Sequence, residues 1–351
     1  MNNALTNKCN EKWLNEVSFM RPILLIMLLV YHSFAPYSGA WTKPEAIQDV
    51  TIYKWIDLAA YSFLLEGFIF ISGYVFTYQL IGNHHFESFK ELAVNKFRRL
   101  IIPSLFFSFL YYLLFENYTS TFTAIISIMG GVAHLWYLPC LFWCFLLQYI
   151  IFHYKVSHKI VLLCLFFLAF FQFLPLPFQI SKTMYYMQFF YGGGVFWKYK
   201  DFFTRYTIGR NYVTINFFLL FLIVFVVLNL LMEEIKFFAD IEDLYVKAIL
   251  LGCNNLLKAI IGWNGIAFIY IFGILFCRKY ELNVLFVKMG TYAYAIYVIH
   301  QFILIYLYRY TSLSSELGSY WLPWAGIFIT AIVSFTIASI IRSTRIGRKY
   351  L

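Results

Sequence analysis

Arg21 and His32, in the first long apolar segment of the chain, have types and a spacing that could do chemistry. On a helix, eleven positions turn through ~1100°, about 20° beyond three full turns, and rise by ~16 Å. Both side chains are therefore predicted on one helix face. A guanidinium binds phosphate, and an imidazole exchanges a proton near neutral pH. Two structural alternatives stay open, because Arg21 can extend to lipid headgroups and His32 can be a hydrogen-bonded structural residue.

Three further ionisable residues, Glu66, His134 and His300, lie in or beside apolar segments. An ionisable group in a membrane span costs ~2.5 to 3.5 kcal/mol, so each is a functional candidate. The carboxyl group of Glu66 must be paired or protonated there. His300 lies ~18 Å beyond Lys288 on its predicted helix, a depth similar to that of His32. We therefore expect the two imidazoles to share a polar cavity.

A cationic cluster formed by Lys96, Arg98 and Arg99 precedes the third apolar segment. Cationic side chains of this kind bind phosphate groups, which predicts a site for the phosphates of a cytoplasmic ligand. A signal for membrane orientation, or contact with anionic lipids, is the alternative interpretation.

Small residues and the remaining histidines have simpler interpretations. Ser72, Gly73 and the triplet at 192–194 lie within apolar segments, where small residues let helices approach closely. We expect packing there rather than a phosphate-binding loop. The other four histidines fall in predicted cytoplasmic connections and are assigned to solvated loops: His84, His85, His153 and His158.

The composition shows which elements must position these residues. Of the 351 residues, 62% are hydrophobic and 13% charged, whereas soluble domains have about 45–50% and ~25%. Lipid must therefore solvate most of the chain, which excludes soluble, disordered and fibrous classes. We predict an all-α polytopic membrane protein, one domain over 1–351 without a soluble appendage. Its ten predicted helices are Val17–Ala35, Trp55–Ile81, Phe97–Phe115, Leu135–His153, Ile160–Leu176, Met184–Tyr199, Tyr212–Met232, Leu256–Cys277, Leu285–Tyr308 and Trp321–Ile341.

The distribution of charge predicts the orientation. The chain has 27 Lys and Arg against 17 acidic residues. If the N-terminus is cytoplasmic, twenty of these 27 basic residues fall on the cytoplasmic side, and an even number of spans returns the C-terminus there. This clustering between spans makes nucleic acid an unexpected partner. The six cysteines have no spacing with histidine that suits a metal, and none is expected.

The chain contains five motifs in order: Arg21-x10-His32, Phe-Ile-Ser-Gly-Tyr at 70–74, Lys96-x-x-Arg99, His-Leu-Trp-Tyr-Leu at 134–138 and Tyr294-x-x-Tyr297-x-x-His300. Together they resemble those of the membrane acyltransferase 3 family, and they cover nearly the whole chain. Two departures from the family pattern concern cations. Lys96 replaces an arginine and lacks its planar fork. Ser18 replaces an aspartate that could orient Arg21, a role for which Glu16 or Glu66 could substitute.

This resemblance implies transfer of an acyl group, commonly acetyl from acetyl-CoA, to a hydroxyl of an extracytoplasmic glycan or lipid-linked saccharide. His32 would be the general base or form a transient acyl-histidine. His300 and His134 would orient the acceptor or the base, and Glu66 would be a buried partner of a cation. The phosphates of CoA would be held by Lys96, Arg98, Arg99 and Arg21. The implied location is the plasma or inner membrane, with both termini cytoplasmic.

Two other classes compete with this interpretation. A transporter or flippase for a lipid-linked glycan could use intramembrane His and Glu to relay protons, but no internal repeat or pair of broken helices is evident. A glycan polymerase is expected to have a large outer loop, and the loops here are short.

Overall fold

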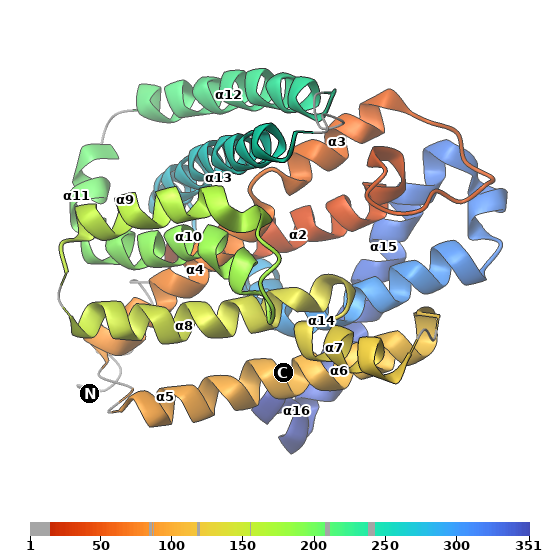
Figure 1. The fold of residues 1–351 in the computed structure, drawn as a ribbon, viewed down its shortest axis with the longest axis horizontal. Helices are drawn as coiled ribbons and strands as arrows, with labels where there is room; N and C mark the ends of the chain where they lie inside the picture. Colours follow the sequence, from red (N-terminus) through yellow and green to blue (C-terminus); the bar gives the residue numbers. More distant parts are fainter. Residues whose placement is uncertain are drawn as a thin grey trace. The chain divides into compact units, whose positions relative to one another are not determined.

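The computed structural model describes residues 15–83, 86, 88–117, 120–154, 156–207, 211–237 and 243–351. His84 and His85, assigned above to solvated loops, lie outside these residues. Helices account for nearly all of the described chain, which has no strand there, and this confirms the all-α prediction (Figure 1). The α-helices are α2 (Asn15–Ser38), α3 (Thr51–Tyr61), α4 (Leu64–Thr77), α5 (Phe89–Lys96), α6 (Ile102–Phe115), α7 (Thr121–Gly130), α8 (Tyr137–His153), α9 (His158–Ala169), α10 (Ile180–Lys198), α11 (Lys200–Thr207), α12 (Asn211–Phe237), α13 (Leu244–Lys279), α14 (Val284–Tyr310), α15 (Leu313–Ser343) and α16 (Arg345–Tyr350). Two π-helices, η1 (Tyr78–Gly82) and η2 (Phe97–Ile101), and two 3₁₀ helices, η3 (Ala133–Trp136) and η4 (Phe170–Phe173), adjoin them.

Seven helical stretches in the described residues are long and apolar enough to cross a membrane. The polytopic membrane prediction is therefore confirmed. The other three predicted spans correspond to α9, α10 and α12, and the total of ten stays a prediction. The seven are Asn15–Ser38, Thr51–Gly82, Phe89–Phe115, Ala133–His153, Leu244–Lys279, Val284–Tyr310 and Leu313–Ser343.

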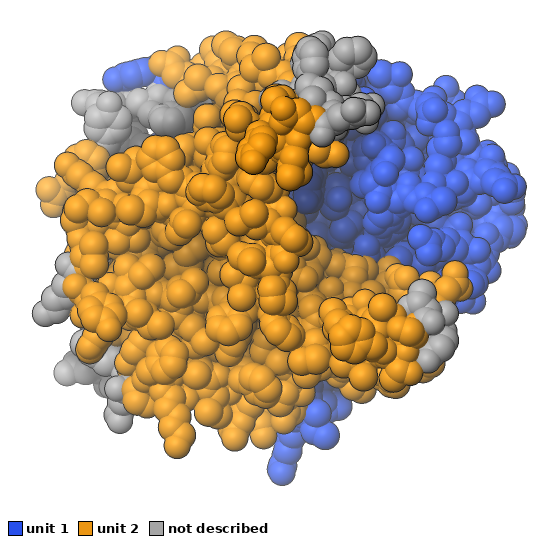
Figure 2. Space-filling model, viewed as in Figure 1, with its two compact units in different colours: residues 1–64, 207–214, 267–348 blue, residues 65–206, 215–266, 349–351 orange. Residues whose placement is uncertain are grey.

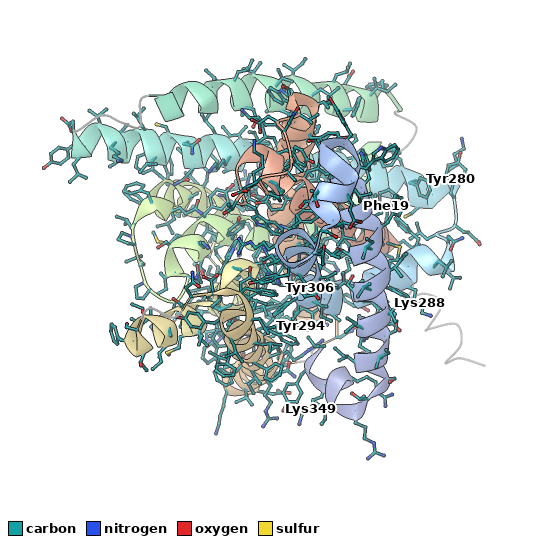
Figure 3. All side chains as sticks on the ribbon, turned by 90° about the vertical axis from the view of Figure 1, so that its right-hand side faces the viewer. Phe19, Tyr280, Lys288, Tyr294, Tyr306 and Lys349 are labelled. Carbon is teal, nitrogen blue, oxygen red and sulfur yellow. The ribbon has the colours of Figure 1, made fainter. Side chains whose placement is uncertain are left out.

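The chain divides into two compact units (Figure 2). Unit 1 comprises residues 1–64, 207–214 and 267–348, and unit 2 comprises 65–206, 215–266 and 349–351. In unit 1, α2 packs against α3, α14 and α15. Its aromatic packing continues to the end of α13, where Phe276 contacts both Phe19 and Tyr280, which are labelled in Figure 3. The prediction of a single membrane domain stays a prediction.

Helices α2 and α14 run in the same direction. Phe19 packs near Phe286 at one end, and at the other the Tyr308 hydroxyl donates to the Ser33 carbonyl at 2.9 Å. Two membrane spans run in parallel only when an odd number of crossings separates them. Four of the seven stretches lie between these two, and if all four cross, one or all three of α9, α10 and α12 also cross. The predicted total of ten meets this condition.

In unit 2, glycines bring α4 and α10 into backbone contact. A Cβ placed on Gly73 would lie 1.8 Å from the Phe190 carbonyl oxygen, and one on Gly193 would lie 2.1 Å from the Phe70 oxygen. Such distances are far below van der Waals contact, so only glycine fits at either position. The prediction that these glycines serve helix packing is confirmed.

The second predicted span is not one continuous α-helix. Residues 62 and 63 form a turn between α3 and α4, and the Ser62 hydroxyl donates to the Ala59 carbonyl at 2.8 Å. Glu66 consequently lies in the first turn of α4 rather than near the middle of a helix. A helix N-terminus carries a partial positive charge, which stabilises a carboxylate at this position.

Candidate active site

His32 and His300 form the centre of the candidate site in unit 1. Their rings stack with centroids 4.8 Å apart and planes inclined by 21°. Trp41, in the loop after α2, stacks on His32 with centroids 5.5 Å apart and planes inclined by 17°. Both imidazoles are buried, His300 completely. The depths estimated from helical rise therefore correctly predicted that these two histidines lie together. The contact of Trp41 with His32 was not predicted from the sequence.

A backbone carbonyl fixes the tautomer of His300. Its Nδ1 lies 2.6 Å from the Tyr297 carbonyl oxygen. Because a carbonyl can only accept, Nδ1 must carry the hydrogen, and Nε2 is the nitrogen of the neutral ring that can take a proton. Two imidazolium rings at 4.8 Å would repel each other. The stack is therefore suited to holding one proton at a time.

Arg21 lies on the same side of α2 as His32. A Cβ placed on Gly290 of α14 would lie 3.3 Å from the Arg21 Cβ, just as His32 meets His300 of α14 further along. Helix α2 is continuous between the two residues, despite Pro22. The predicted face, with a guanidinium at one level and an imidazole at another, is thus the face that packs on α14.

Glu66 has its partners in unit 2. Its carboxylate accepts a hydrogen bond from the Tyr185 hydroxyl at 3.0 Å, and the charge of Lys258 on α13 acts on it. A Cβ on Gly262 would lie 2.9 Å from the Glu66 Cγ, so α13 packs directly against this side chain. Lys258 is exposed, and the role of Glu66 as a buried partner of a cation stays a prediction. The contact with Tyr185 was not predicted from the sequence.

The cationic cluster does not present its three charges on one surface. Lys96 is buried, and its ammonium lies 3.8 Å from the ring centroid of Phe145, with Phe86 and Phe76 at 5.3 and 5.6 Å. Such an arrangement is a cation–π site. Arg98 and Arg99 are exposed. Lys96 thus does not share the exposed surface of these two arginines, and its predicted role at a phosphate stays a prediction.

The reason for this separation is the π-helix η2. In an α-helix, residues three apart lie on the same face. In η2, which follows Lys96 directly, the wider turn closes hydrogen bonds between residues five apart. Lys96 consequently faces inward while Arg99 faces outward. π-helical turns are frequent at functional sites.

His134 is buried in η3, and its ring lies 6.2 Å from that of Tyr111 in an edge-to-face arrangement. The preceding residue, Ala133, has a positive φ of 49°, in the region where side chains are disfavoured. The Ser108 hydroxyl accepts from the Val132 backbone N–H at 3.1 Å and helps to hold this turn.

A pocket of about 540 Å³ in unit 2 includes Phe86, His158 and Lys198. The Lys198 ammonium donates to Nε2 of His158 at 3.0 Å, and Nδ1 of His158 lies 2.7 Å from the Tyr191 hydroxyl. Burial, and secondarily the charge of Lys198, lowers the pKa of His158, which favours the neutral ring that can accept this bond. The assignment of His158 to a solvated loop was therefore wrong.

No three His, Cys, Asp or Glu side chains gather at a possible metal site in the part of the chain that the structure describes. The candidate residues of the two units are imidazoles, cations and one carboxyl group.

A family model described as an acyltransferase domain matches residues 14–343. The chain belongs to the membrane acyltransferase 3 family. The predicted resemblance is confirmed, and with its apolar helices the protein is a membrane acyltransferase. Searches of curated proteins and of solved structures returned no match.

The predicted site residues of this acyltransferase divide between the units. Unit 1 brings Arg21, His32 and His300 to the interface of α2 and α14. Unit 2 contains the other predicted residues: Glu66, Lys96, Arg98, Arg99 and His134. Lys198 and His158 join this second set as basic groups that line a pocket.

Proposed function

We propose that this membrane acyltransferase is an O-acyltransferase. It moves an acyl group, acetyl in our proposal, from cytoplasmic acyl-CoA to a hydroxyl of an extracytoplasmic glycan or lipid-linked saccharide. The observation that carries the proposal is the buried stack of His32 on His300, with the tautomer of His300 fixed by a carbonyl. Membership of an acyltransferase family favours this enzyme over a transporter or flippase.

The histidine pair supplies the proton transfer that the reaction needs. His32 accepts the proton of the acceptor hydroxyl while the oxygen attacks the thioester carbonyl. The tetrahedral intermediate collapses, the C–S bond breaks, and His32 returns the proton to the sulfur of the leaving CoA. One alcohol and one thioester thus become one ester and one thiol, with no net proton change.

Two groups of basic residues are suited to the phosphates of the donor. Arg98 and Arg99 are exposed cations, and the pocket that includes Phe86 adds Lys198 beside His158. Arg21, on the His32 face of α2, is the other cation that the proposal assigns to these phosphates. CoA is a polyanion, so charge-assisted hydrogen bonds at these positions favour its binding.

We place the protein in the plasma or inner membrane with both termini cytoplasmic, and the distribution of basic residues supports this orientation. In that orientation Arg98 and Arg99 face the compartment that contains CoA. His134 and the turn that holds it then lie toward the acceptor.

Radiolabelled acetyl-CoA tests the proposal directly. Purified protein in nanodiscs is incubated with the labelled donor and with oligosaccharides released by mild acid from the envelope of the cells that naturally produce it. We expect label to appear as an alkali-labile ester on the saccharide. If no label moves while the protein is monodisperse, the proposed reaction is wrong.

Replacing both arginines of η2, Arg98→Gln and Arg99→Gln, is expected to raise the KM for acetyl-CoA by about tenfold or more. A hydrogen bond to a charged group contributes about 1.5 to 3 kcal/mol, and tenfold corresponds to about 1.4 kcal/mol. The acceptor KM should stay unchanged. Lys90→Gln on α5 is the control, because this lysine is exposed outside the motif. Equal increases in both KM values would show an insertion defect instead.

Trp41→Leu is expected to lower kcat by about 2- to 30-fold. The indole face lies against the ring that becomes an imidazolium during proton transfer, and a cation–π contact contributes about 0.5 to 2 kcal/mol. The pH profile of kcat is the measurement that separates this from a packing effect, since losing the indole should shift its acidic limb. Trp41→Phe should restore most of the rate. An unchanged pH profile would contradict this positioning role.

A further inference from the structure

A second pocket of unit 2, of about 620 Å³, is built from loops and helix ends. Its lining comes from the end of α6, from α7, from the turn that precedes His134 and from the segment before α10. Ala133, immediately before His134 in the chain, belongs to this lining. The pocket therefore adjoins a residue of the candidate site.

Backbone strain is concentrated at this pocket. In the described residues, the non-glycine positions with positive φ are Ala133, Phe178 and Gln179, at 49°, 51° and 64°. All three line the pocket, as does Gly131 with φ of 86°. Side chains disfavour this conformation, and strain of this kind clusters at functional sites.

Specific hydrogen bonds hold the strained walls in place. The Gln179 side-chain amide donates to the Gly130 carbonyl at 2.7 Å and so joins the segment before α10 to α7. The Trp143 indole N–H donates to the Phe178 carbonyl at 3.1 Å. The pocket is consequently preformed, which lowers the entropy cost of binding a ligand.

The lining selects the class of ligand. Tyr112, Phe178 and Met129 offer apolar surface, and Gln179, Ser127 and Glu116 offer hydrogen-bonding groups. Glu116 is the charged side chain of the lining, and its carboxylate would repel the phosphates of a nucleotide donor. A pyranose ring presents an apolar C–H face and a rim of hydroxyl groups, which matches this combination.

We infer that this pocket, which we call the saccharide pocket, binds a neutral sugar residue of the acceptor next to His134. The inference rests on the proposed function for its substrate class. A sugar stacks on Tyr112 and Phe178, and its hydroxyls donate to the carboxylate of Glu116 and to the side-chain oxygen of Gln179. Its site is separate from the basic residues that hold the donor, so acceptor and donor binding can be altered independently.

Glu116→Gln combined with Tyr112→Leu tests the saccharide pocket by kinetics. The KM for the envelope oligosaccharides is expected to rise about tenfold or more, since a hydrogen bond to a charged group and an apolar contact are both lost. The KM for acetyl-CoA should not change. Glu45→Gln is the matched control, because this carboxylate is exposed in the loop after α2. An unchanged acceptor KM in the double variant would overturn the inference.

A binding measurement without donor keeps this inference distinguishable from the proposed reaction. The thiol introduced by Ser127→Cys is reacted in nanodiscs with a membrane-impermeant maleimide, and labelling is quantified on its own peptide by mass spectrometry. The envelope oligosaccharides are expected to slow labelling at least about fivefold. If the oligosaccharides protect this thiol from labelling but no acyl group is transferred, the saccharide pocket is supported and the proposed function is rejected. Transfer without protection, or a thiol already shielded by lipid alone, would overturn the saccharide pocket.

Discussion

His32→Gln is expected to lower kcat for acyl transfer by about 100- to 10,000-fold, the range that a general base contributes. Glutamine keeps a hydrogen-bonding side chain of similar reach but cannot take the proton of the acceptor hydroxyl. The KM for acetyl-CoA should remain near its normal value, since the proposed phosphate ligands are untouched. The measurement is transfer of labelled acetyl at saturating donor and acceptor, with monodispersity in detergent as the check on folding.

A double variant tests whether His32 and His300 act together, which no single variant can show. If His32 and His300 act as one unit, His300→Gln should also cost a large factor, and the double variant should cost no more than the worse single variant. Independent contributions would multiply instead. Turnover within about tenfold of normal in folded His32→Gln would eliminate the base assignment.

The parts of this site that the sequence predicted are those determined by helical periodicity. Arg21 and His32 share a face because eleven residues complete three turns, and α2 stays helical throughout. His300 was placed near His32 from the rise per residue alone, and the rings do stack. The two helices run in parallel, so equal distances along them correspond to equal depth.

The parts that were missed depend on backbone conformation and on partners distant in the sequence. Because of one π-helical turn, Lys96 packs among phenylalanines while Arg99 faces outward. No residue type in Phe97–Ile101 predicts this turn. The strained residues are an alanine, a phenylalanine and a glutamine rather than glycines, so their residue types did not predict a positive φ. Glu66 accepts a hydrogen bond from Tyr185, 119 residues further along the chain, a contact that tertiary packing alone determines.

The sequence predicted that these glycines serve helix packing, because small residues in apolar helices commonly let helices approach closely. It did not predict how close the approach is, since the sequence does not show which atoms of the neighbouring helix lie opposite each glycine. At the crossing of α4 and α10 those atoms belong to the backbone of Phe70 and Phe190. A backbone cannot rotate away as a side chain can.

Gly193→Ala is therefore expected to prevent the stable packing of α4 on α10. The added Cβ would lie 2.1 Å from the Phe70 carbonyl oxygen and 2.9 Å from the Tyr74 nitrogen, so the helices must separate along their length. Overpacking costs about 1 to 3 kcal/mol where side chains can adjust, and more is expected here. Thermal unfolding followed by size exclusion should show a lowered Tm and loss of monodisperse protein. Gly130→Ala is the matched control, because its Cβ would meet the Gln179 amide nitrogen at an ordinary 3.6 Å and alanine favours helix. Equal stability of the two variants would mean that α4 and α10 do not cross through these glycines.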